Sequence, residues 1–573
     1  MANEIISTSL AATYMLNDAD VLYITTTGQI TTSSTVALTN FASTDDGLNI
    51  VIAGRVTSLS AAAISLNSTA ASILAYDNLT IAETGSVTSV TSTAILLSRS
   101  REEVNNLGTV MGGAHGIAIT GDQAAVRNQG MIQAGGTGVR LTGDYATIAN
   151  AGEITAYNGI YVSGNDSHVL NSGQILTSAT QAGVSTFGIY LAGFDTTHLD
   201  NSGDILGTGQ TAVSMYGNTA AQSFVTNTGT IIGQRYGLET RTGTASVDNS
   251  GVISGSDSGL YASGDALHLT NSGAITSTAG SVLYCVGTLN LHNSGSIAAT
   301  GPDGVAITLH LAAANSVIAN YGTISATFGA AVDASTVTTG GAIFLRNFGT
   351  VDGSYIGAGV VDYLTNRGTM DLVATGDAND SIVNRGLISG PVLLGNGNDS
   401  YDGRRGEASY VDGGQNDDIL RGGAVEDDLR GGGGNDTLFG GDGDDVLDGS
   451  LGSDGMSGGV GDDVLTGGAD GDFLTGGIGA DRFVFASAAD IGLALTRDRI
   501  TDFNNGNDWI DLSAFMAGAT FIGGAGFSAT AAGEVRYVVA SGILSGDVNG
   551  DGVTDWQLAL TSKPTVTAAD FLF

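Results

Sequence analysis

The chain has 573 residues, of which 57 are Asp or Glu and only 19 are Lys or Arg, so its formal net charge is −38. This balance excludes the basic face that nucleic-acid binding needs, and it makes an anionic membrane surface a poor partner. The single cysteine, Cys285, excludes an intrachain disulfide framework. Since 42% of the residues are hydrophobic and recur at regular intervals among 89 glycines, we expect a repeat protein with a core.

The N-terminal segment shows no targeting signal. Residues 1–7 lack a basic stretch followed by an apolar one, so no N-terminal secretory signal peptide is expected. No run of about 18 apolar residues occurs anywhere, and the sequence therefore predicts no transmembrane segment. We expect residues 1–27 to form an N-terminal cap.

Residues 28–390 contain a long repeat with the motif Asn-x-Gly-x-[Ile/Val/Met], most often at intervals of 22 residues, with weaker copies at Gly28, Gly54 and Gly85. Between the motifs, short runs alternate apolar with polar residues, which is the pattern of β-strands. About three such strands per period indicate a parallel β-helix, or β-solenoid, of about sixteen rungs. The anchor asparagines are Asn106, Asn128, Asn150, Asn171, Asn201, Asn227, Asn249, Asn271, Asn293, Asn320, Asn347, Asn366 and Asn384.

The recurrent asparagine has a structural explanation. Stacked amide side chains can hydrogen-bond along the solenoid axis as a ladder, and Asn also tolerates the left-handed backbone of a sharp corner. We therefore predict a structural and not a catalytic role for these residues. The longer intervals, from Asn171 to Asn227 and from Asn293 to Asn347, predict side loops, which are the expected places for specific contacts.

Two outward-facing columns leave alternatives open. The first consists of His168, His198 and His268. These side chains either decorate the surface or share a metal ion, although the sequence places no carboxylate or Cys beside them. The second column consists of Tyr161, Tyr190 and Tyr261. Tyrosine is favoured in strands for packing reasons, and a stripe of its rings is also suited to stack on sugars.

Residues 391–484 contain a different repeat of ten units with the consensus G-G-x-G-x-D-x-U-x, in which U is a large apolar residue. The clearest copies begin at Gly431, Gly440 and Gly458. The only unit without the acidic residue is the ten-residue unit 403–412, which has Ala408 at the sixth position. The sixth-position carboxylates are Asp399, Asp418, Asp427, Asp436, Asp445, Asp454, Asp463, Asp472 and Asp481.

This spacing suits calcium. A glycine-rich turn exposes its carbonyl oxygens, the Asp adds a carboxylate, and Ca²⁺ accepts six to eight oxygen ligands in irregular geometry. The x-U-x segment is a short strand with one inward side chain, at Tyr401 and Tyr410 as at the later apolar positions. Two units form one coil of a β-roll, so turns 18 residues apart stack and bind about eight ions between them. The turn glycines predicted at the metal sites are Gly432, Gly434, Gly441, Gly443, Gly459 and Gly461.

The nonapeptide is similar to the hemolysin-type calcium-binding repeat of RTX proteins. The residues beyond it resemble the C-terminal region of RTX proteins, most closely that of serralysin-type metalloproteases. The matching segments are Ala480-Asp-Arg-Phe483-Val-Phe485, Asp498-Arg-Ile-Thr-Asp502-Phe503, Gly506-Asn-Asp508-Trp-Ile510-Asp511-Leu512-Ser513 and Thr567-Ala-Ala-Asp570-Phe571-Leu572-Phe573.

The resemblance implies a β-rich C-terminal cap, residues 485–573, that contains an uncleaved signal for type I export. It also implies the type I secretion machinery as a partner and a Gram-negative bacterium as the source. The protease part is missing, because the chain contains no His-Glu-x-x-His motif. Without calcium, the roll is expected to be close to disordered, since its carboxylates repel one another and it has few inward side chains.

A second candidate calcium loop lies within the cap. Asp547, Asn549, Asp551 and Asp555 have the spacing that begins an EF-hand loop. The twelfth position is Leu558, where a bidentate Glu is expected, so the segment is either a short calcium loop or a hairpin turn rich in Asp and Asn.

The sequence thus predicts an all-β protein with a parallel β-solenoid, an RTX β-roll and a cap. The rungs resemble the solenoids of bacterial adhesins, as in Asn171-Ser-Gly173-Gln-Ile175. We expect a secreted structural or adhesive protein of the cell surface or matrix, such as an adhesin, a biofilm component or an S-layer subunit, which binds itself or a surface polysaccharide. The alternative is a polysaccharide epimerase or lyase with an RTX module. That activity needs clustered acidic, basic or aromatic groups on one face, but the only lysine is Lys563.

Overall fold

The computed structural model describes residues 3–16, 21–40, 48–66, 77–178, 186–310, 315–338, 340–408, 410–504 and 506–573. It confirms the all-β class, with parallel solenoid coils, a β-roll and a β-rich C-terminal region. The described helices are the four-residue α1 (Ala488–Ile491) and the 3-10 helix η1 (Ala568–Asp570), and none is long and apolar enough to cross a membrane. The chain divides into two compact units, residues 1–310 with 322–329 and residues 311–321 with 330–573.

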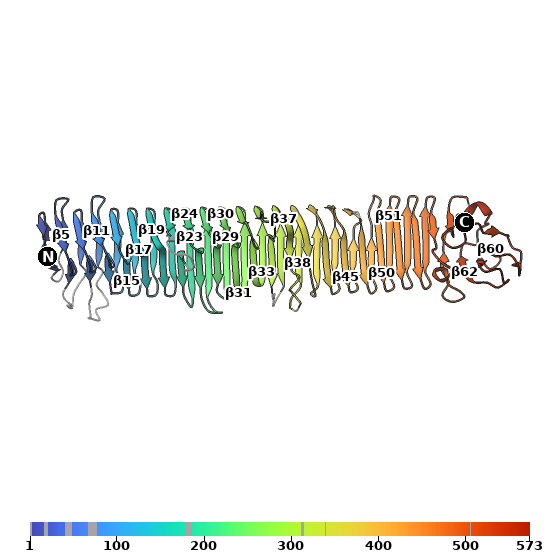
Figure 1. The fold of residues 1–573 in the computed structure, drawn as a ribbon, viewed down its shortest axis with the longest axis horizontal. Helices are drawn as coiled ribbons and strands as arrows, with labels where there is room; N and C mark the ends of the chain where they lie inside the picture. The colour runs from blue at the N-terminus through green and yellow to red at the C-terminus, as the bar shows by residue number, and fades with distance from the viewer. Residues whose placement is uncertain are drawn as a thin grey trace. The chain divides into compact units, whose positions relative to one another are not determined.

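The first unit is built from coils of three short strands. One coil comprises β13 (Glu103–Asn106), β14 (Thr109–Gly112) and β15 (His115–Thr120), and β13 pairs in parallel with β16 (Ala125–Asn128) of the next coil. Figure 1 shows these strands stacked in columns. The other strands in the column of β13 are β1 (Asn3–Ile6), β4 (Val21–Ile24), β7 (Asn49–Ile52), β10 (Asn78–Ile81), β18 (Thr147–Asn150), β20 (Ser167–Asn171), β23 (Thr196–Asn201), β26 (Gln222–Asn227), β29 (Thr244–Asn249) and the ends of β31 (Ser258–Asn271) and β33 (Leu283–Asn293).

The core of this unit consists of apolar residues that alternate with exposed polar ones and stack on the same residue type in the next coil. Ile132, Ile154 and Ile175 follow one another in register, and each is fully buried. Burial of one such side chain contributes about 1.5–3 kcal/mol to folding, so the period-two pattern is enough to fix which face turns inward.

The anchor asparagines form the predicted hydrogen-bond ladder. Asn106 Nδ2 donates to Asn128 Oδ1 at 2.7 Å, and the series continues through Asn271 to Asn293. A second series, from Asn320 to Asn384, lies in the second unit. The expectation of a left-handed corner is wrong, because none of these asparagines, all of them described, has a positive φ. The motif glycine is needed instead for close approach, since a Cβ on Gly130 would collide with the carbonyl oxygen of Gly108.

The second unit continues with solenoid coils and then with the β-roll, in which two strands make a coil of 18 residues. In the roll, Leu429 of one coil faces Leu447 of the next, and both are fully buried. The roll strands are β45 (Val392–Asn396), β46 (Ser400–Asp402), β47 (Glu407–Ala408), β48 (Val411–Gln415), β49 (Ile419–Arg421), β50 (Asp428–Gly433), β51 (Thr437–Asp442), β52 (Val446–Leu451), β53 (Gly455–Val460), β54 (Val464–Ala469), β55 (Phe473–Ile478) and β56 (Arg482–Val484).

One inward position in the roll differs from the prediction. Val411, and not Tyr410, is in register with Leu429 and fully buried. The additional residue of the ten-residue unit moves Tyr410 to a half-buried position, where its hydroxyl lies 3.0 Å from Asp412 Oδ2. Of the predicted side loops, residues 179–185 and 311–314 lie outside the described residues.

The C-terminal region closes the roll with short strands. The last coils pair in parallel with β57 (Arg499–Ile500) and β58 (Trp509–Asp511), and β58 pairs with β63 (Phe571–Leu572). The antiparallel strands β60 (Glu534–Val538), β61 (Ile543–Asp547) and β62 (Trp556–Leu560) follow a different pattern from the coils. This antiparallel pairing ends the repeat.

Candidate metal centre

The turns of the roll have a backbone that glycine favours. The second and fourth positions of the units have positive φ at the predicted glycines, for example +109° at Gly432, +137° at Gly434, +125° at Gly441 and +122° at Gly443. Gly459 and Gly461 repeat these values at +127° and +143°. Residues with a Cβ are strained in this region of φ, which explains why glycine recurs there.

The sixth-position carboxylates lie in two columns, one along each flank of the roll. The first flank contains Asp399, Asp418, Asp436, Asp454 and Asp472. The second flank contains Asp427, Asp445, Asp463 and Asp481. In both columns, the Oδ1 atom of one Asp accepts a hydrogen bond from the backbone N–H of the Asp one coil earlier, as between Asp436 N and Asp454 Oδ1 at 2.7 Å.

The other carboxylate oxygen has no hydrogen-bond partner along most of each column. These Asp side chains are almost completely buried, so an unpaired anionic oxygen there is costly unless a cation neutralises it. Asp427 at the start of the second flank is the exception, because its Oδ2 accepts the Gly423 N–H at 2.6 Å. The unpaired Oδ2 atoms in the roll belong to Asp399, Asp418, Asp436, Asp445, Asp454, Asp463, Asp472 and Asp481.

Backbone carbonyl oxygens approach the same places. A Cβ on Gly440, the first residue of its unit, would collide with Asp445 Oδ2 and with the carbonyl oxygen of Gly458 in the next coil. Gly449 lies in the same way against Asp454 Oδ2 and the Gly467 carbonyl oxygen. At Gly413, Gly422, Gly440 and Gly449, the first-position glycine therefore leaves room in which a carboxylate and a carbonyl from successive coils converge.

This donor set fits a hard cation that takes oxygen ligands. Among the described residues, no group of three or more His, Cys, Asp or Glu side chains could hold a metal ion on its own. A cation on these columns must therefore take several ligands from the backbone, as Ca²⁺ does. The unpaired oxygens and the glycine-lined space are consistent with calcium between successive turns.

Burial raises the pKa of these carboxyl groups. It raises the pKa of Asp418 to about 8, and those of Asp445, Asp454 and Asp481 to about 7, with neighbouring Asp charges adding to the effect. Backbone N–H groups that donate to the carboxylates oppose the shift. A column of such groups without metal is therefore partly protonated near neutral pH.

The structure explains the one unit that lacks Asp. Ala408 is in register with Ile388, a buried apolar residue of the solenoid coil before it. The next unit on this flank has Asp427 at the same position of the repeat. Ala408 therefore lies where the second flank changes from an apolar column to an acidic one.

Further members of the columns were not predicted. On the first flank, Asp362 and Asp380 precede Asp399, and Asp498 follows Asp472. On the second flank, Asp508 follows Asp481. The spacing of 18 between Asp362 and Asp380 was a usable signal, but the intervals of 26 and 27 that precede Asp498 and Asp508 hide them from a nonapeptide pattern.

The loop from Asp547 to Asp555 joins the antiparallel strands β61 and β62. Asp547 is fully buried and accepts N–H groups from Gly550 at 2.7 Å and Gly552 at 2.8 Å. Asp555 Oδ2 accepts the Val548 N–H at 2.7 Å. These bonds hold the turn, and they are compatible with both alternatives, a calcium loop and a hairpin turn.

A carboxylate that the sequence did not indicate lies beside the histidine column. Asp200 Oδ2 lies 2.8 Å from His168 Nε2, and the rings of His168 and His198 are 5.6 Å apart. His198 stacks on Phe224 at 4.8 Å, and His268 contacts Asn290. These ring contacts pack the column against its neighbours in successive coils, as a surface role expects, and the shared ion stays an alternative prediction.

The tyrosine column is a ladder of stacked rings. Tyr161 and Tyr190 lie 5.1 Å apart and nearly parallel, Tyr190 stacks on Tyr216, and Tyr261 stacks on Tyr284 at 5.2 Å. Because each ring covers the face of the next, these faces are not open to a sugar ring. The geometry favours the structural explanation of the stripe.

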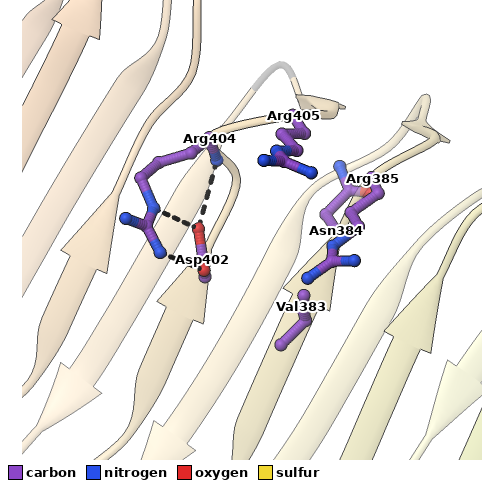
Figure 2. Close-up of a pocket in the computed structure, with 6 residues that line it drawn as sticks. All are labelled: Val383, Asn384, Arg385, Asp402, Arg404 and Arg405. Carbon is purple, nitrogen blue, oxygen red and sulfur yellow. Dashed lines mark hydrogen bonds and ion pairs between the residues drawn. The ribbon is translucent and has the colours of Figure 1, made fainter.

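A small hollow of about 230 Å³ lies beside the irregular unit, between β43 (Ser381–Asn384) and β46. Figure 2 shows Arg404 facing Asp402, to which it donates at 2.8 Å, with Arg385 and Arg405 nearby. Within the described residues, no carboxylate pairs with Arg385 or Arg405. This is a local concentration of positive charge on an acidic chain.

The C-terminal part of the chain is similar in sequence to known proteins. No curated protein is significantly similar to the chain. A solved structure, the AlgE6R3 subunit of the Azotobacter vinelandii mannuronan C5-epimerase, is 27% identical over 28% of this chain and 78% of its own, with a TM-score of 0.19. Residues 396–573 match the family described as Peptidase M10 serralysin C terminal. The chain therefore ends in an RTX-type region similar to the C-terminal part of serralysins.

Proposed function

We propose that this protein is a secreted, calcium-dependent structural or adhesive protein of the cell surface or extracellular matrix, like an adhesin, a biofilm component or an S-layer subunit. The main support is the pair of Asp columns, whose buried Oδ2 atoms lack partners. The proposed ligands are the sixth-position Asp residues, carbonyl oxygens of the glycine turns and, in the cap, the loop from Asp547 to Asp555. About eight ions would fill the roll.

Calcium would control where the roll folds. In the proposed route, a Gram-negative cell exports the chain by type I secretion while low cytosolic calcium keeps the roll loose. Calcium outside the cell then folds it, because binding free energy becomes folding free energy. The similarity of residues 396–573 to the serralysin C-terminal region supports this route.

The solenoid coils support a structural or adhesive role. Their outward-facing, mostly half-buried side chains are organised as ladders, such as the stacked tyrosines and the histidine column, and these give a regular surface. The partner would be a second copy of the chain or an acidic surface polysaccharide. Arg385 and Arg405 beside the hollow suit an anionic group of such a polymer.

Electron microscopy with and without Ca²⁺ tests the proposal. Ordered sheets or filaments that form only with calcium, or calcium-dependent binding to cells or acidic polysaccharide, would support it. A monodisperse monomer that binds none of these in either condition would contradict it. Incubation with acidic polysaccharides should give neither unsaturated products nor epimers, and turnover would replace the structural role with a carbohydrate-active one.

A further inference from the structure

The carboxylate column of the first flank begins before the nonapeptide array. Asp362 N donates to Asp380 Oδ1 at 2.7 Å, and Asp380 N donates to Asp399 Oδ1 at 2.7 Å. In the coil before Asp362, the same register position is Ile343, which is buried. The column is thus two coils longer than the array. Its first two members lie outside residues 396–573, which match the serralysin C-terminal family.

The turn that precedes Asp362 has the geometry of the roll turns. A Cβ on Gly357 would collide with Asp362 Oδ2 and with the carbonyl oxygen of Thr375 in the next coil. Gly413 has the same two neighbours, Asp418 Oδ2 and the Gly431 carbonyl oxygen. The space beside a first-position glycine is therefore present outside the array.

The following turn has the backbone of the array without its full sequence. Gly376 has a φ of +100°, close to the +107° of Gly395 and the +109° of Gly432 at their equivalent second positions. Ala378 occupies the fourth position with a φ of +133°, although an alanine is strained there. The turn therefore has the backbone conformation of the array turns. The strain at Ala378 costs free energy, which the binding of a ligand would offset.

The two carboxylates at this place are buried, and no positively charged side chain acts on either of them. Asp362 is fully buried and Asp380 is 2% exposed, and neither Asp362 oxygen nor Asp380 Oδ2 has a hydrogen-bond partner of good geometry. The neighbouring donors are hydroxyl groups, Tyr355 beside Asp362 and Thr375 beside Asp380, and neither brings a positive charge. Two stacked buried carboxylates without a cation are unfavourable.

We propose that the turns 357–362 and 375–380 bind a divalent cation of the calcium type through Asp362, Asp380 and the Thr375 carbonyl oxygen. The inference rests on the proposed calcium binding by the array and extends it into the solenoid coils before the array. On the opposite flank of these coils, Asn366 Nδ2 donates to Asn384 Oδ1 at 2.9 Å, and this bond requires no ion. The proposed site therefore lies in coils that are joined on one flank by the Asn ladder and on the other by the carboxylate column.

Hydrogen–deuterium exchange of the full chain, with and without Ca²⁺, tests this site. Amides of residues 353–380 should exchange about tenfold more slowly when free Ca²⁺ is ten times the dissociation constant. Asp362→Asn and Gly357→Ala should abolish this slowing, the first by removing charge and the second by filling the space. Asp352→Asn, at an exposed position outside both turns, is the matched control and should retain it.

The array is the internal reference for this experiment, because residues 431–481 should be protected by calcium in all four proteins. Loss of slowing at residues 353–380 in the two test variants alone would support the site. Calcium protection of the array without slowing at residues 353–380, or equal slowing in every variant, would overturn the inference and leave the proposed function intact. If residues 431–481 did not respond in the wild-type chain, the proposed calcium binding would fail as well.

Discussion

The Asn ladder and the Asp columns are two solutions to the same problem, a polar side chain buried between stacked coils. In the ladder, the amide of Asn249 accepts from Asn227 and donates to Asn271, both at 2.7 Å. In the columns, the carboxylate of Asp454 accepts from the Asp436 N–H but leaves its Oδ2 unpaired. The two side chains have nearly the same size and differ in one atom.

That atom decides whether the coils need an ion. An amide is donor and acceptor at once, so a column of amides satisfies itself, whereas an ionised carboxylate only accepts. A column of carboxylates therefore needs an external positive charge at each step. The difference predicts that one part of the chain folds independently of calcium and the other does not.

Removal of calcium should give the largest effect and should separate the two regions. In excess chelator, proteinase K should cleave the full chain within residues 413–481 and leave the ladder coils between Asn106 and Asn293 intact, because only the columns lose their neutralising charge. Mass spectrometry of the fragments measures this, with added Mg²⁺ as the control ion. Equal cleavage of both regions, or of neither, would contradict the comparison.

Substitution of one column member should have the next largest effect. Asp445→Asn removes a buried charge that faces the proposed cation, and breaking a buried charge pair costs about 3–5 kcal/mol. We expect the calcium concentration at the folding midpoint, followed by circular dichroism, to rise about a hundredfold or more. Asp442→Asn, at an exposed position of the same turn, is the control and should shift it little. If the calcium concentration at the midpoint shifted equally in the two variants, net charge and not membership of the column would determine the calcium requirement.

Acidification should weaken calcium binding. The pKa of Asp445 is raised to about 7, so at pH 5 its proton must be displaced and the apparent affinity should fall about a hundredfold relative to pH 8. Calcium-free stability should change in the opposite direction: the folded carboxyl binds its proton more tightly than the unfolded one, so stability is greatest below about pH 4 and is lost as pH rises towards 7. Calorimetric titration at pH 5, 6, 7 and 8 measures the first trend, and a flat affinity would contradict it.

Removal of one ladder amide should have the smallest effect, and it should be independent of calcium. Asn249→Ala removes the side-chain acceptor of the Asn227 amide and the side-chain donor to Asn271 Oδ1, which should lower the free energy of unfolding by about 1–3 kcal/mol. Thr226→Ala, at an exposed site of the neighbouring coil, should change it little. Urea denaturation with and without Ca²⁺ measures the stability of both variants. A loss of stability that appears only with calcium would contradict the distinction between the Asn ladder and the Asp columns.

The sequence was sufficient for the features that depend on local repetition. The period of the Asn motif predicted the solenoid and its ladder, and the fixed phase of the nonapeptide predicted the two flanks of Asp. It was insufficient where register departs from the repeat. The position of Val411 depends on an additional residue in one unit, and the turn of Asp380 has Thr375 and Ala378 in place of two consensus glycines. The spacing of 18 between Asp362 and Asp380 is a signal in the sequence, and the pairing of coils places both residues in the column.

The most direct test is a crystal structure of the full chain grown with Ca²⁺, with anomalous scattering used to place the ions. Anomalous peaks should lie beside the unpaired Oδ2 atoms, for example between Asp454 and the Gly467 carbonyl oxygen, and none should lie along the ladder from Asn106 to Asn293. Peaks confined to exposed carboxylates such as Asp442, or a column whose Oδ2 atoms stay without a cation in saturating calcium, would contradict the account.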